Sequence, residues 1–336
     1  MVKKNKPVAV TMGDPSGIGP DITIQTWLRR KELKVPNFVY VGSEDLLIKR
    51  AKKLGLKINT TTINSINDVN DAFKETIPIL NIKTKDVDPG VPLNDSYRPI
   101  IESINISTEL ALSSEVSSIC TNPVNKNFLS KNGFEFSGQT EYLSYLCNDL
   151  FQPVMMLASE KLKVIPLTRH IPLKKVSKMI TKKLIIDTIS IARNDLVKYF
   201  NIKNPRIYVS GLNPHSGDGG LIGTEEIEII IPAIKELKES GVLIKGPLSA
   251  DSMFHKDIIK DYDLAICMYH DQALIPIKSI SFYDAVNVTL GLPLFRTSPD
   301  HGTAYELAGT GRTECRSFYE SLLLAHNSTE NCRSIN

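Results

Sequence analysis

The sequence predicts an α/β protein with largely parallel sheets, because short β-branched segments alternate with helical patterns along most of its 336 residues. Six apolar runs have the length and composition of buried strands: 8–12, 38–42, 117–122, 164–168, 206–211 and 264–269. Segments with helical periodicity separate or follow them, at 20–30, 44–54, 100–113, 139–149, 184–200 and 224–240. Parallel strands need long crossover connections, and a helix between two strands provides one.

Some of these elements also carry signals at their ends. Thr224 can cap the last predicted helix, and Gly241 marks its end. Glu225 and Glu226 stand in its first turn, where the helix dipole favours negative charge. The segment 57–99 is rich in Asn, Thr and Asp and has weaker periodicity, so we expect variable surface structure there.

The composition favours a cytoplasmic protein that works on a small molecule. Forty basic and 37 acidic residues leave a net charge of +3, which gives no reason to expect nucleic acid or a membrane surface as a partner. The five cysteines are scattered and never spaced C-x-x-C, so a reducing compartment fits best and a thiolate zinc site is not expected. No apolar run approaches about 18 residues, and no signal-peptide pattern follows the basic N-terminus.

Three of the six histidines directly follow predicted strands. His170, His215 and His270 each stand just past the carboxyl end of an apolar run. Ligands of open parallel sheets gather outside those ends, where three neutral imidazoles could converge on a divalent metal. Their wide spacing matches no local ligand signature, so a hydrogen-bonded loop histidine is the competing interpretation at each position. Asp251 and Asp271 could be further ligands or partners of ligands, or could cap a turn and a helix.

Two further regions combine glycine with polar residues. In residues 10–27, a strand leads through Gly13, Gly17 and Gly19 into a helix whose N-terminus would favour an anion such as a dinucleotide phosphate. The glycine spacing is neither G-x-G-x-x-G nor a Walker A loop, so a tight structural turn is an equal alternative. The second region, 290–311, is too polar for a core segment.

Three side chains in and before the second region suit an anionic substrate. Lys278, Asn287 and Arg296 together offer two fixed positive charges and an amide, which fit a phosphate or a carboxylate. The competing interpretation is that Lys278 and Arg296 are ordinary surface charges.

Longer motifs are more specific than these single residues. Five of them occur in order: GDPSGIGPD, GLNPHSGDGG, GPLSADSMF, MYHDQALIPIK and VNVTLGLPLFRTSPDHGTAYELAGTG. Together they resemble the 4-hydroxythreonine-4-phosphate dehydrogenase family of vitamin B6 synthesis, from about residue 7 to residue 325. The first and last motifs are also similar to loops of the isocitrate and isopropylmalate dehydrogenases.

The resemblance implies a fold of two α/β/α domains with a cleft between them, like the isocitrate and isopropylmalate dehydrogenases and unlike a standard Rossmann domain. The first domain would comprise 1–135 and 300–336, with the glycine loop and the cofactor loop. The second, 136–299, would carry the metal and substrate site and the dimer interface.

The resemblance also implies an activity. The family oxidises the C3 hydroxyl of 4-phosphooxy-L-threonine with NAD or NADP. The product, 2-amino-3-oxo-4-(phosphooxy)butyrate, loses carbon dioxide to give 3-amino-2-oxopropyl phosphate on the route to pyridoxine 5′-phosphate. Family members are homodimers whose site for one divalent metal, zinc, cobalt or magnesium, is shared across the interface.

The family's functional residues match positions of this chain. The expected metal ligands are His170, His215 and His270. The expected substrate-binding residues are Gln139, Thr140, Lys278, Asn287 and Arg296, and the cofactor would contact His301, Gly302, Thr303 and Ala304. We expect Lys278 to be the catalytic proton-transfer residue, because a nearby divalent cation disfavours the charged form of a lysine.

Three departures from the family pattern bear on function. Gln139 replaces a histidine of a GHTE motif and can donate a hydrogen bond but never carry charge. Asp21 replaces a glutamate, and Thr310 replaces a lysine near the proposed cofactor loop. The same chemistry on 4-phospho-D-threonate or 4-phosphoerythronate is therefore an alternative. More distant alternatives are a metal-dependent phosphohydrolase, which would not need the DHGTAYELAG loop, and a non-catalytic phosphate- or metal-binding protein.

Overall fold

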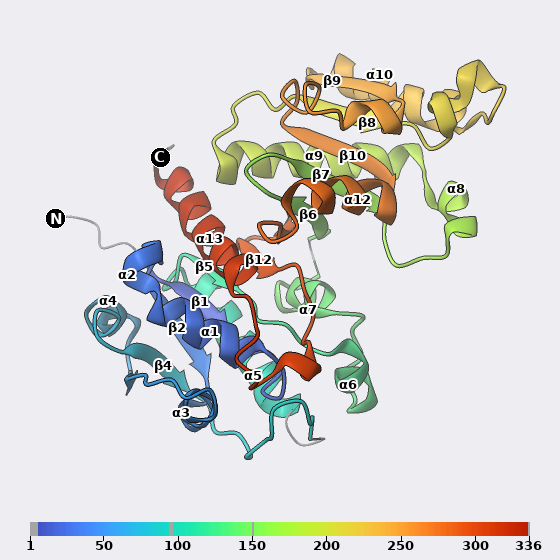
Figure 1. Cartoon of the computed structure of the whole chain (residues 1–336). Helices are drawn as coiled ribbons and strands as arrows, with labels where there is room; N and C mark the ends of the chain where they lie inside the picture. The colour runs from blue at the N-terminus through green and yellow to red at the C-terminus, as the bar shows by residue number, and fades with distance from the viewer. Residues whose placement is uncertain (1–5, 94–96, 150, 335–336) are drawn as a thin grey trace. The chain divides into compact units, whose positions relative to one another are not determined.

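The computed structural model describes residues 6–93, 97–149 and 151–334, and it divides the chain into two α/β units (Figure 1). The first unit comprises the described residues up to Pro153 and Leu292–Arg333, and the second comprises Val154–Gly291. The mixed α/β fold expected from the sequence is confirmed in both. Residues 136–153 and 292–299, which the sequence assigned to the second domain, group with the first unit, where Tyr142 donates a 2.6 Å hydrogen bond to Asn105.

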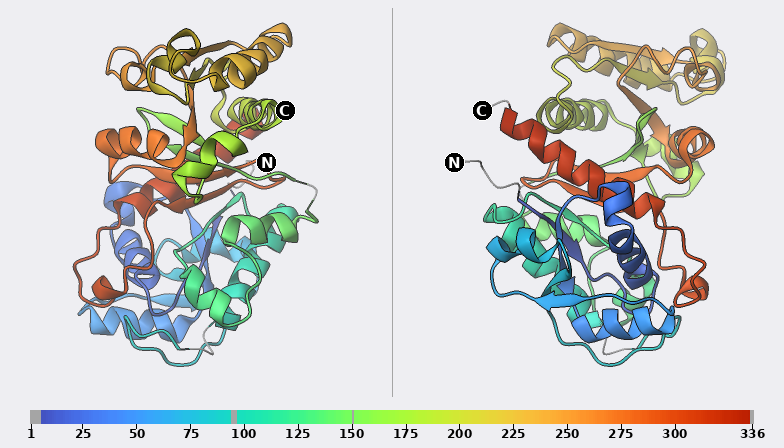
Figure 2. Two further views of the ribbon diagram at one scale, coloured as in Figure 1. Left: turned by 90° about the vertical axis from the view of Figure 1, so that its right-hand side faces the viewer. Right: turned by 60° about the vertical axis from the view of Figure 1, so that its left-hand side comes forward.

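The first unit contains six parallel strands in the order β3-β4-β2-β1-β5-β12. They are β1 (Val8–Thr11), β2 (Phe38–Gly42), β3 (Thr60–Thr62), β4 (Ile77–Asn81), β5 (Ser118–Cys120) and β12 (Arg296–Pro299). Val8 and Val10 enter one apolar core, and Ala9 enters a second core. Both faces of this sheet are therefore covered by helices, as parallel sheets require (Figure 2).

The helices of the first unit are short except for two. They are α1 (Gly19–Leu28), α2 (Arg30–Leu33), α3 (Glu44–Lys53), α4 (Val69–Ala72), α5 (Tyr97–Leu112), α6 (Lys126–Lys131), α7 (Gln139–Leu146) and α13 (Arg316–Ser334), with single turns at Ile66–Asp68 and Tyr305–Leu307. The Ser43 hydroxyl caps the start of helix α3 by accepting a 3.2 Å bond from the Leu46 amide. The negative charge of Glu44 in the first turn interacts favourably with the helix dipole.

The second unit contains six strands in the order β11-β6-β7-β10-β8-β9. They are β6 (Val154–Ala158), β7 (Lys163–Thr168), β8 (Ile207–Ser210), β9 (Ile244–Leu248), β10 (Leu264–Tyr269) and β11 (Val286–Leu290). Strands β7, β10, β8 and β9 are parallel, whereas β6 is antiparallel to both β7 and β11. The antiparallel pair arises because only a tight turn, closed by a 2.8 Å bond from Ser159 to Leu162, joins β6 to β7.

Helices of the second unit connect these strands. They are α8 (Val176–Met179), α9 (Lys182–Phe200), α10 (Ile231–Glu239), α11 (Ala250–Met253) and α12 (His270–Ser281), with 3₁₀ turns at Leu173–Lys175 and Pro214–Gly220 and a π-helical turn at Glu226–Ile230. No helix among the described residues is long and apolar enough to cross a membrane.

All six predicted strands form, but two other expectations are wrong. The segment 57–99 contributes β3 and β4 to the sheet, and Ile77 and Ile79 are fully buried. The helix expected at 224–240 begins with the π-helical turn, and no side chain caps it. Gly241 does follow its end, with φ of 82°.

Candidate functional site

The three candidate metal histidines lie at the carboxyl ends of neighbouring parallel strands of the second unit. His170 follows β7, His270 follows β10 and His215 follows β8, and these strands pair in the order β7-β10-β8. Parallel pairing therefore brings all three loops to one edge of the sheet, as the sequence predicted.

His170 and His270 are close together. Their ring centroids are 5.5 Å apart, and the ring planes are inclined by 47°. Nδ1 of His270 lies 2.7 Å from a carboxylate oxygen of Asp271. These residues line a pocket of about 310 Å³ with Thr168, Ile171, Leu173, Val176 and Tyr269. A carboxylate that orients a histidine in this way is common beside metal sites.

His215 stands in a tight loop with left-handed backbone geometry. Its φ is 52°, and φ stays positive through Gly219. Nearby, the Ser249 hydroxyl donates a 2.6 Å bond to Asp251 on α11, and this bond holds the pKa of that carboxyl below its usual range. Among the described residues no three His, Cys, Asp or Glu side chains form a group that could hold a metal ion. The structure thus pairs His170 with His270 but does not gather the full trio within one chain.

A strand-end frame, formed by Thr168, Ser210, Met268 and Gln272, joins the three strands just before the histidines. The Thr168 hydroxyl donates to the Met268 carbonyl (2.8 Å), which links β7 to β10. The Gln272 side-chain oxygen accepts from the Met268 amide (2.7 Å) and the Ser210 hydroxyl (2.8 Å). Its NH₂ group donates to the Gly211 carbonyl (2.9 Å), which links β10 to β8. Sequence reasoning missed Gln272, although the polar residue directly after HD in MYHDQALIPIK was a usable signal.

Glu226 fixes the loop that carries His215. Its side chain is almost fully buried, and it accepts 2.8 Å bonds from the amides of Leu212 and Asn213 and a 2.9 Å bond from the Asn213 side chain. Burial alone would raise the pKa of Glu226, but the hydrogen bonds from Asn213 outweigh it and hold the pKa below its usual range. A Cβ at Gly217 would lie 2.7 Å from this carboxylate, so glycine is required where the loop passes it.

The two candidate substrate residues of the second unit lie on α12 and β11. Lys278 is half-buried, and its Nζ lies 5.6 Å from the Phe282 ring centroid. Asn287 pairs with Leu157 in the sheet, and its side-chain oxygen has no hydrogen-bond partner among the described residues. Lys278 and His270 share one helix, two turns apart, and therefore lie toward the same face.

The other candidate substrate residues belong to the first unit and meet at the end of β5. Arg296 begins β12, is only 4% exposed and donates to the Thr121 hydroxyl from Nε (3.0 Å) and Nη2 (2.6 Å). Burial lowers its pKa to about 10. Gln139 opens α7 beside Thr140, and its NH₂ group donates to the Asn122 carbonyl at 3.3 Å. Whether Lys278 and Asn287 act together with this group stays a prediction.

The glycine loop is a tight turn whose amides bond within the protein. The Ser16 amide donates to the Asp14 carboxylate (2.9 Å), and the Gly17 amide donates to the Asp14 carbonyl (3.0 Å). The Ile18 amide donates to the Thr303 carbonyl at 3.0 Å. Of the two interpretations of this loop, the geometry favours the structural turn, because these donors are already engaged.

The candidate cofactor segment therefore rests on the glycine loop. Thr303 is buried against it, and a Cβ at Gly17 would lie 3.0 Å from the Thr303 carbonyl oxygen. His301 and Ala304 are half-buried, whereas Gly302 is exposed and a Cβ there would meet no atom within 4 Å. Thr303 thus packs against the glycine loop, whereas the backbone at Gly302 is exposed to solvent.

The sequence is similar to proteins named 4-hydroxythreonine-4-phosphate dehydrogenase. The sequence matches the family described as pyridoxal phosphate biosynthetic protein PdxA over residues 34–325. A protein of Bradyrhizobium diazoefficiens named 4-hydroxythreonine-4-phosphate dehydrogenase is 45% identical over 332 residues, covering 95% of this chain and 96% of its own length. A protein of Methylorubrum extorquens with the same name is 40% identical over 333 residues, covering 97% and 95%. The crystal structure of the Klebsiella pneumoniae protein of that name superposes with a TM-score of 0.87 at 35% identity, covering 98% and 99%.

The strand-end frame predicts a loss of stability when its central amide is removed. Gln272→Met keeps the side-chain volume but leaves buried groups of Ser210, Gly211 and Met268 without partners. We expect the free energy of unfolding to fall by about 1–3 kcal/mol, measured by urea denaturation. Ser279→Ala, on the exposed side of the same helix, is the control and should change it by less than about 0.5 kcal/mol. Equal midpoints for the two variants would contradict the role given to Gln272.

Proposed function

Because the chain belongs to the PdxA family of pyridoxal phosphate biosynthetic proteins, we propose that it is a 4-hydroxythreonine-4-phosphate dehydrogenase. It would transfer hydride from C3 of 4-phosphooxy-L-threonine to NAD or NADP, and the 3-oxo acid would then lose carbon dioxide. The similarity to relatives of that name along nearly the whole chain carries this proposal. We place the reaction in the cytoplasm, because the four cysteines whose side chains are described are buried free thiols.

We assign the substrate phosphate to Arg296, a buried cation of the first unit. A guanidinium removed from water, as in Arg296, attracts a phosphate more strongly than an exposed one, and its planar donors match phosphate oxygens. Gln139 and Thr140 stand at the start of α7 and add neutral donors. Lys278 and Asn287 would hold the amino acid part of the substrate.

We assign one divalent metal to His170, His215 and His270. Neutral imidazoles suit zinc or cobalt better than magnesium, and the close pairing of His170 with His270 supports two of the three ligands. A divalent metal bound there supplies positive charge that stabilises negative charge developing on the C3 oxygen. The contribution of the chain itself is to orient the imidazoles through the strand-end frame and Asp271.

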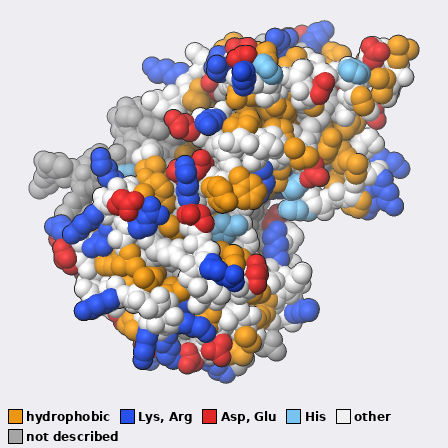
Figure 3. All heavy atoms as spheres, in the orientation of Figure 1, with side chains coloured by type: hydrophobic (Ala, Val, Ile, Leu, Met, Phe, Trp, Pro, Cys, Tyr) orange, Lys and Arg blue, Asp and Glu red, His pale blue; other side chains and the backbone are white. Residues whose placement is uncertain are grey.

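We further propose that a second copy of the chain completes this site. Within the described part of one chain the three histidines do not form a ligand group. Helix α12, which begins at His270, exposes large apolar side chains: Ile275 is 63% exposed, and Phe282 and Tyr283 just beyond it are 63% and 58% exposed. Apolar side chains also gather on the visible surface of the second unit (Figure 3). A homodimer would bury such a surface beside the histidines.

The catalytic proposal for Lys278 is tested by Lys278→Met. If Lys278 accepts the C3 hydroxyl proton, we expect kcat to fall about 10²–10⁴-fold in steady-state assays of NADH formation. Lys256→Met, an exposed lysine of the same unit, is the control and should leave kcat unchanged. Turnover by Lys278→Met at the control rate would exclude the role.

The activity itself is tested by NADH or NADPH formation from 4-phosphooxy-L-threonine, followed at 340 nm. We expect chelation to abolish the reaction and zinc or cobalt to restore it. Reduction of neither cofactor by any of the three phosphorylated substrates named above would contradict the dehydrogenase proposal.

The same assay distinguishes the two substrate classes. Turnover of 4-phospho-D-threonate or 4-phosphoerythronate, but not of the amino acid, would keep the chemistry and change the substrate. Turnover of 4-phosphooxy-L-threonine by Gln139→His would then identify Gln139 as the residue that changes the substrate, because a protonated imidazole adds charge that the amide lacks.

A further inference from the structure

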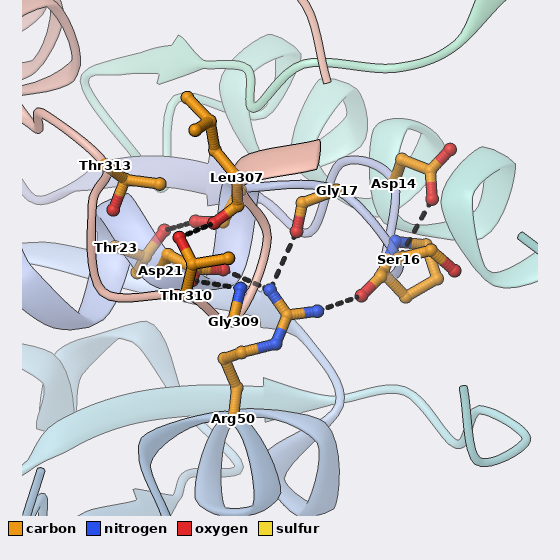
Figure 4. Close-up of polar contacts among 12 residues, drawn as sticks. Asp14, Ser16, Gly17, Asp21, Thr23, Arg50, Leu307, Gly309, Thr310 and Thr313 are labelled. Carbon is orange, nitrogen blue, oxygen red and sulfur yellow. Dashed lines mark hydrogen bonds and ion pairs between the residues drawn. The ribbon is translucent and has the colours of Figure 1, made fainter. Parts of the chain in front are cut away.

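A buried ion pair lies beneath the glycine loop of the first unit. Arg50 on α3 and Asp21 on α1 form it, and their side chains are 1% and 0% exposed. Arg50 also donates to the backbone carbonyls of Gly17 (2.8 Å) and Pro15 (2.9 Å). Figure 4 shows the guanidinium pointing from α3 into the loop and toward Asp21. One side chain therefore fixes two backbone positions of the glycine loop.

The same pair reaches the segment that follows the candidate cofactor residues. The second carboxylate oxygen of Asp21 accepts a 2.7 Å bond from the Gly309 amide. Asp21 thus bridges the guanidinium that holds the glycine loop and the backbone of the loop after Tyr305–Leu307 (Figure 4).

A second link joins the two loops on the other side. The Tyr305 hydroxyl donates to the Asp14 carboxylate at 2.5 Å, and the Thr303 carbonyl accepts from the Ile18 amide. Segment 303–309 is therefore tied to the glycine loop near both of its ends. Burying two charges costs desolvation energy that their attraction often does not recover, so the pair adds little net stability to the core. The bonds of Arg50 and Asp21 to the loop backbone indicate that the pair positions the two loops.

We propose that Arg50 and Asp21 are positioning residues that set the affinity for the dinucleotide cofactor by holding segment 303–309 against the glycine loop. The inference rests on the proposed function, which assigns His301–Ala304 to the cofactor. The open backbone at Gly302, next to the anchored Thr303, leaves room for a ligand to approach. Neither Arg50 nor Asp21 is exposed, so both would act through the loop and not by contact with the cofactor.

The test compares Arg50→Lys and Asp21→Asn with wild type. Lysine keeps the charge but cannot reach both loop carbonyls and Asp21 at once, and asparagine keeps an acceptor for Gly309 but loses the charge. We expect the dissociation constant of NADH or NADPH, measured by fluorescence of the reduced nicotinamide, to rise about tenfold. KM for the phosphorylated substrate should stay within about twofold, because the proposed substrate-binding residues lie outside segment 303–309 in the sequence. A general loss of structure would change both.

Matched variants control for folding. Lys49→Gln removes the neighbouring, exposed charge of α3 and should leave the dissociation constant unchanged. Asp21→Glu keeps the charge and should retain most of the affinity. If Arg50→Lys and Asp21→Asn fail to fold, Tyr305→Phe removes the hydroxyl that bonds to Asp14, and with it hydrogen bonds to Asn125 and Thr303, and should still weaken cofactor binding.

The outcomes separate this inference from the proposed function. Wild-type affinity in folded Arg50→Lys and Asp21→Asn, or in Tyr305→Phe where those two do not fold, would overturn the positioning role and leave the dehydrogenase proposal standing. A wild-type protein that binds neither NADH nor NADPH would overturn both. Weakened cofactor binding with unchanged KM for substrate would support the inference.

Discussion

The parallel pairing of β7, β10 and β8 is the constraint on which the candidate site depends. Parallel strands end at the same edge of a sheet, so residues far apart in the chain arrive together when each directly follows its strand. His170 and His270 stand within two residues of the ends of β7 and β10, and His215 stands five residues past the end of β8. The strand-end frame then fixes the register of the three ends, because Gln272 bonds to groups of both β10 and β8 and Thr168 bonds to β10. Without this frame the histidine loops would have the freedom of ordinary surface loops.

In the first unit, a buried ion pair and a tight turn position the candidate cofactor segment. Its glycine loop has no free amides to offer a ligand at Ser16, Gly17 or Ile18, since each donates within the protein. The loop instead supports segment 303–309. Arg50 bonds to two of its carbonyls, and Asp21 links Arg50 to the Gly309 amide. In both units, buried polar groups that contact no proposed ligand fix the positions of the loops that carry the candidate binding residues. The geometry of both candidate sites therefore depends on buried residues that lie behind the candidate ligands.

Local patterns allowed much of this to be predicted. The β-branched runs predicted six strands, and a polar residue directly after a run predicted each histidine position. The sequence did not show which distant residues bond to each other: Gln272 bonds to Ser210, and Asp21 bonds to Gly309, across distant parts of the chain. Arg50 did leave a signal, because it stands on the buried stripe of α3 with Leu46 and Leu47, where a cation needs a partner. Strand β4 was missed because its flanking segments are polar, although Ile77 and Ile79 are buried between two neighbouring strands.

The central claim is that the strand-end histidines form one site that two copies of the chain complete, and mixing two inactive variants tests it most directly. His170→Ala and His215→Ala are each expected to be inactive in NADH formation. His170 and His270 lie together in one chain, so we expect His215 to come from the partner. Subunit exchange in an equal mixture then forms hybrid dimers in which one of the two sites is intact. The mixture should then recover about a quarter of the wild-type activity. Hybrid dimers that form, as shown by differently tagged subunits, but remain inactive would contradict a site in which His170 comes from one copy and His215 from its partner.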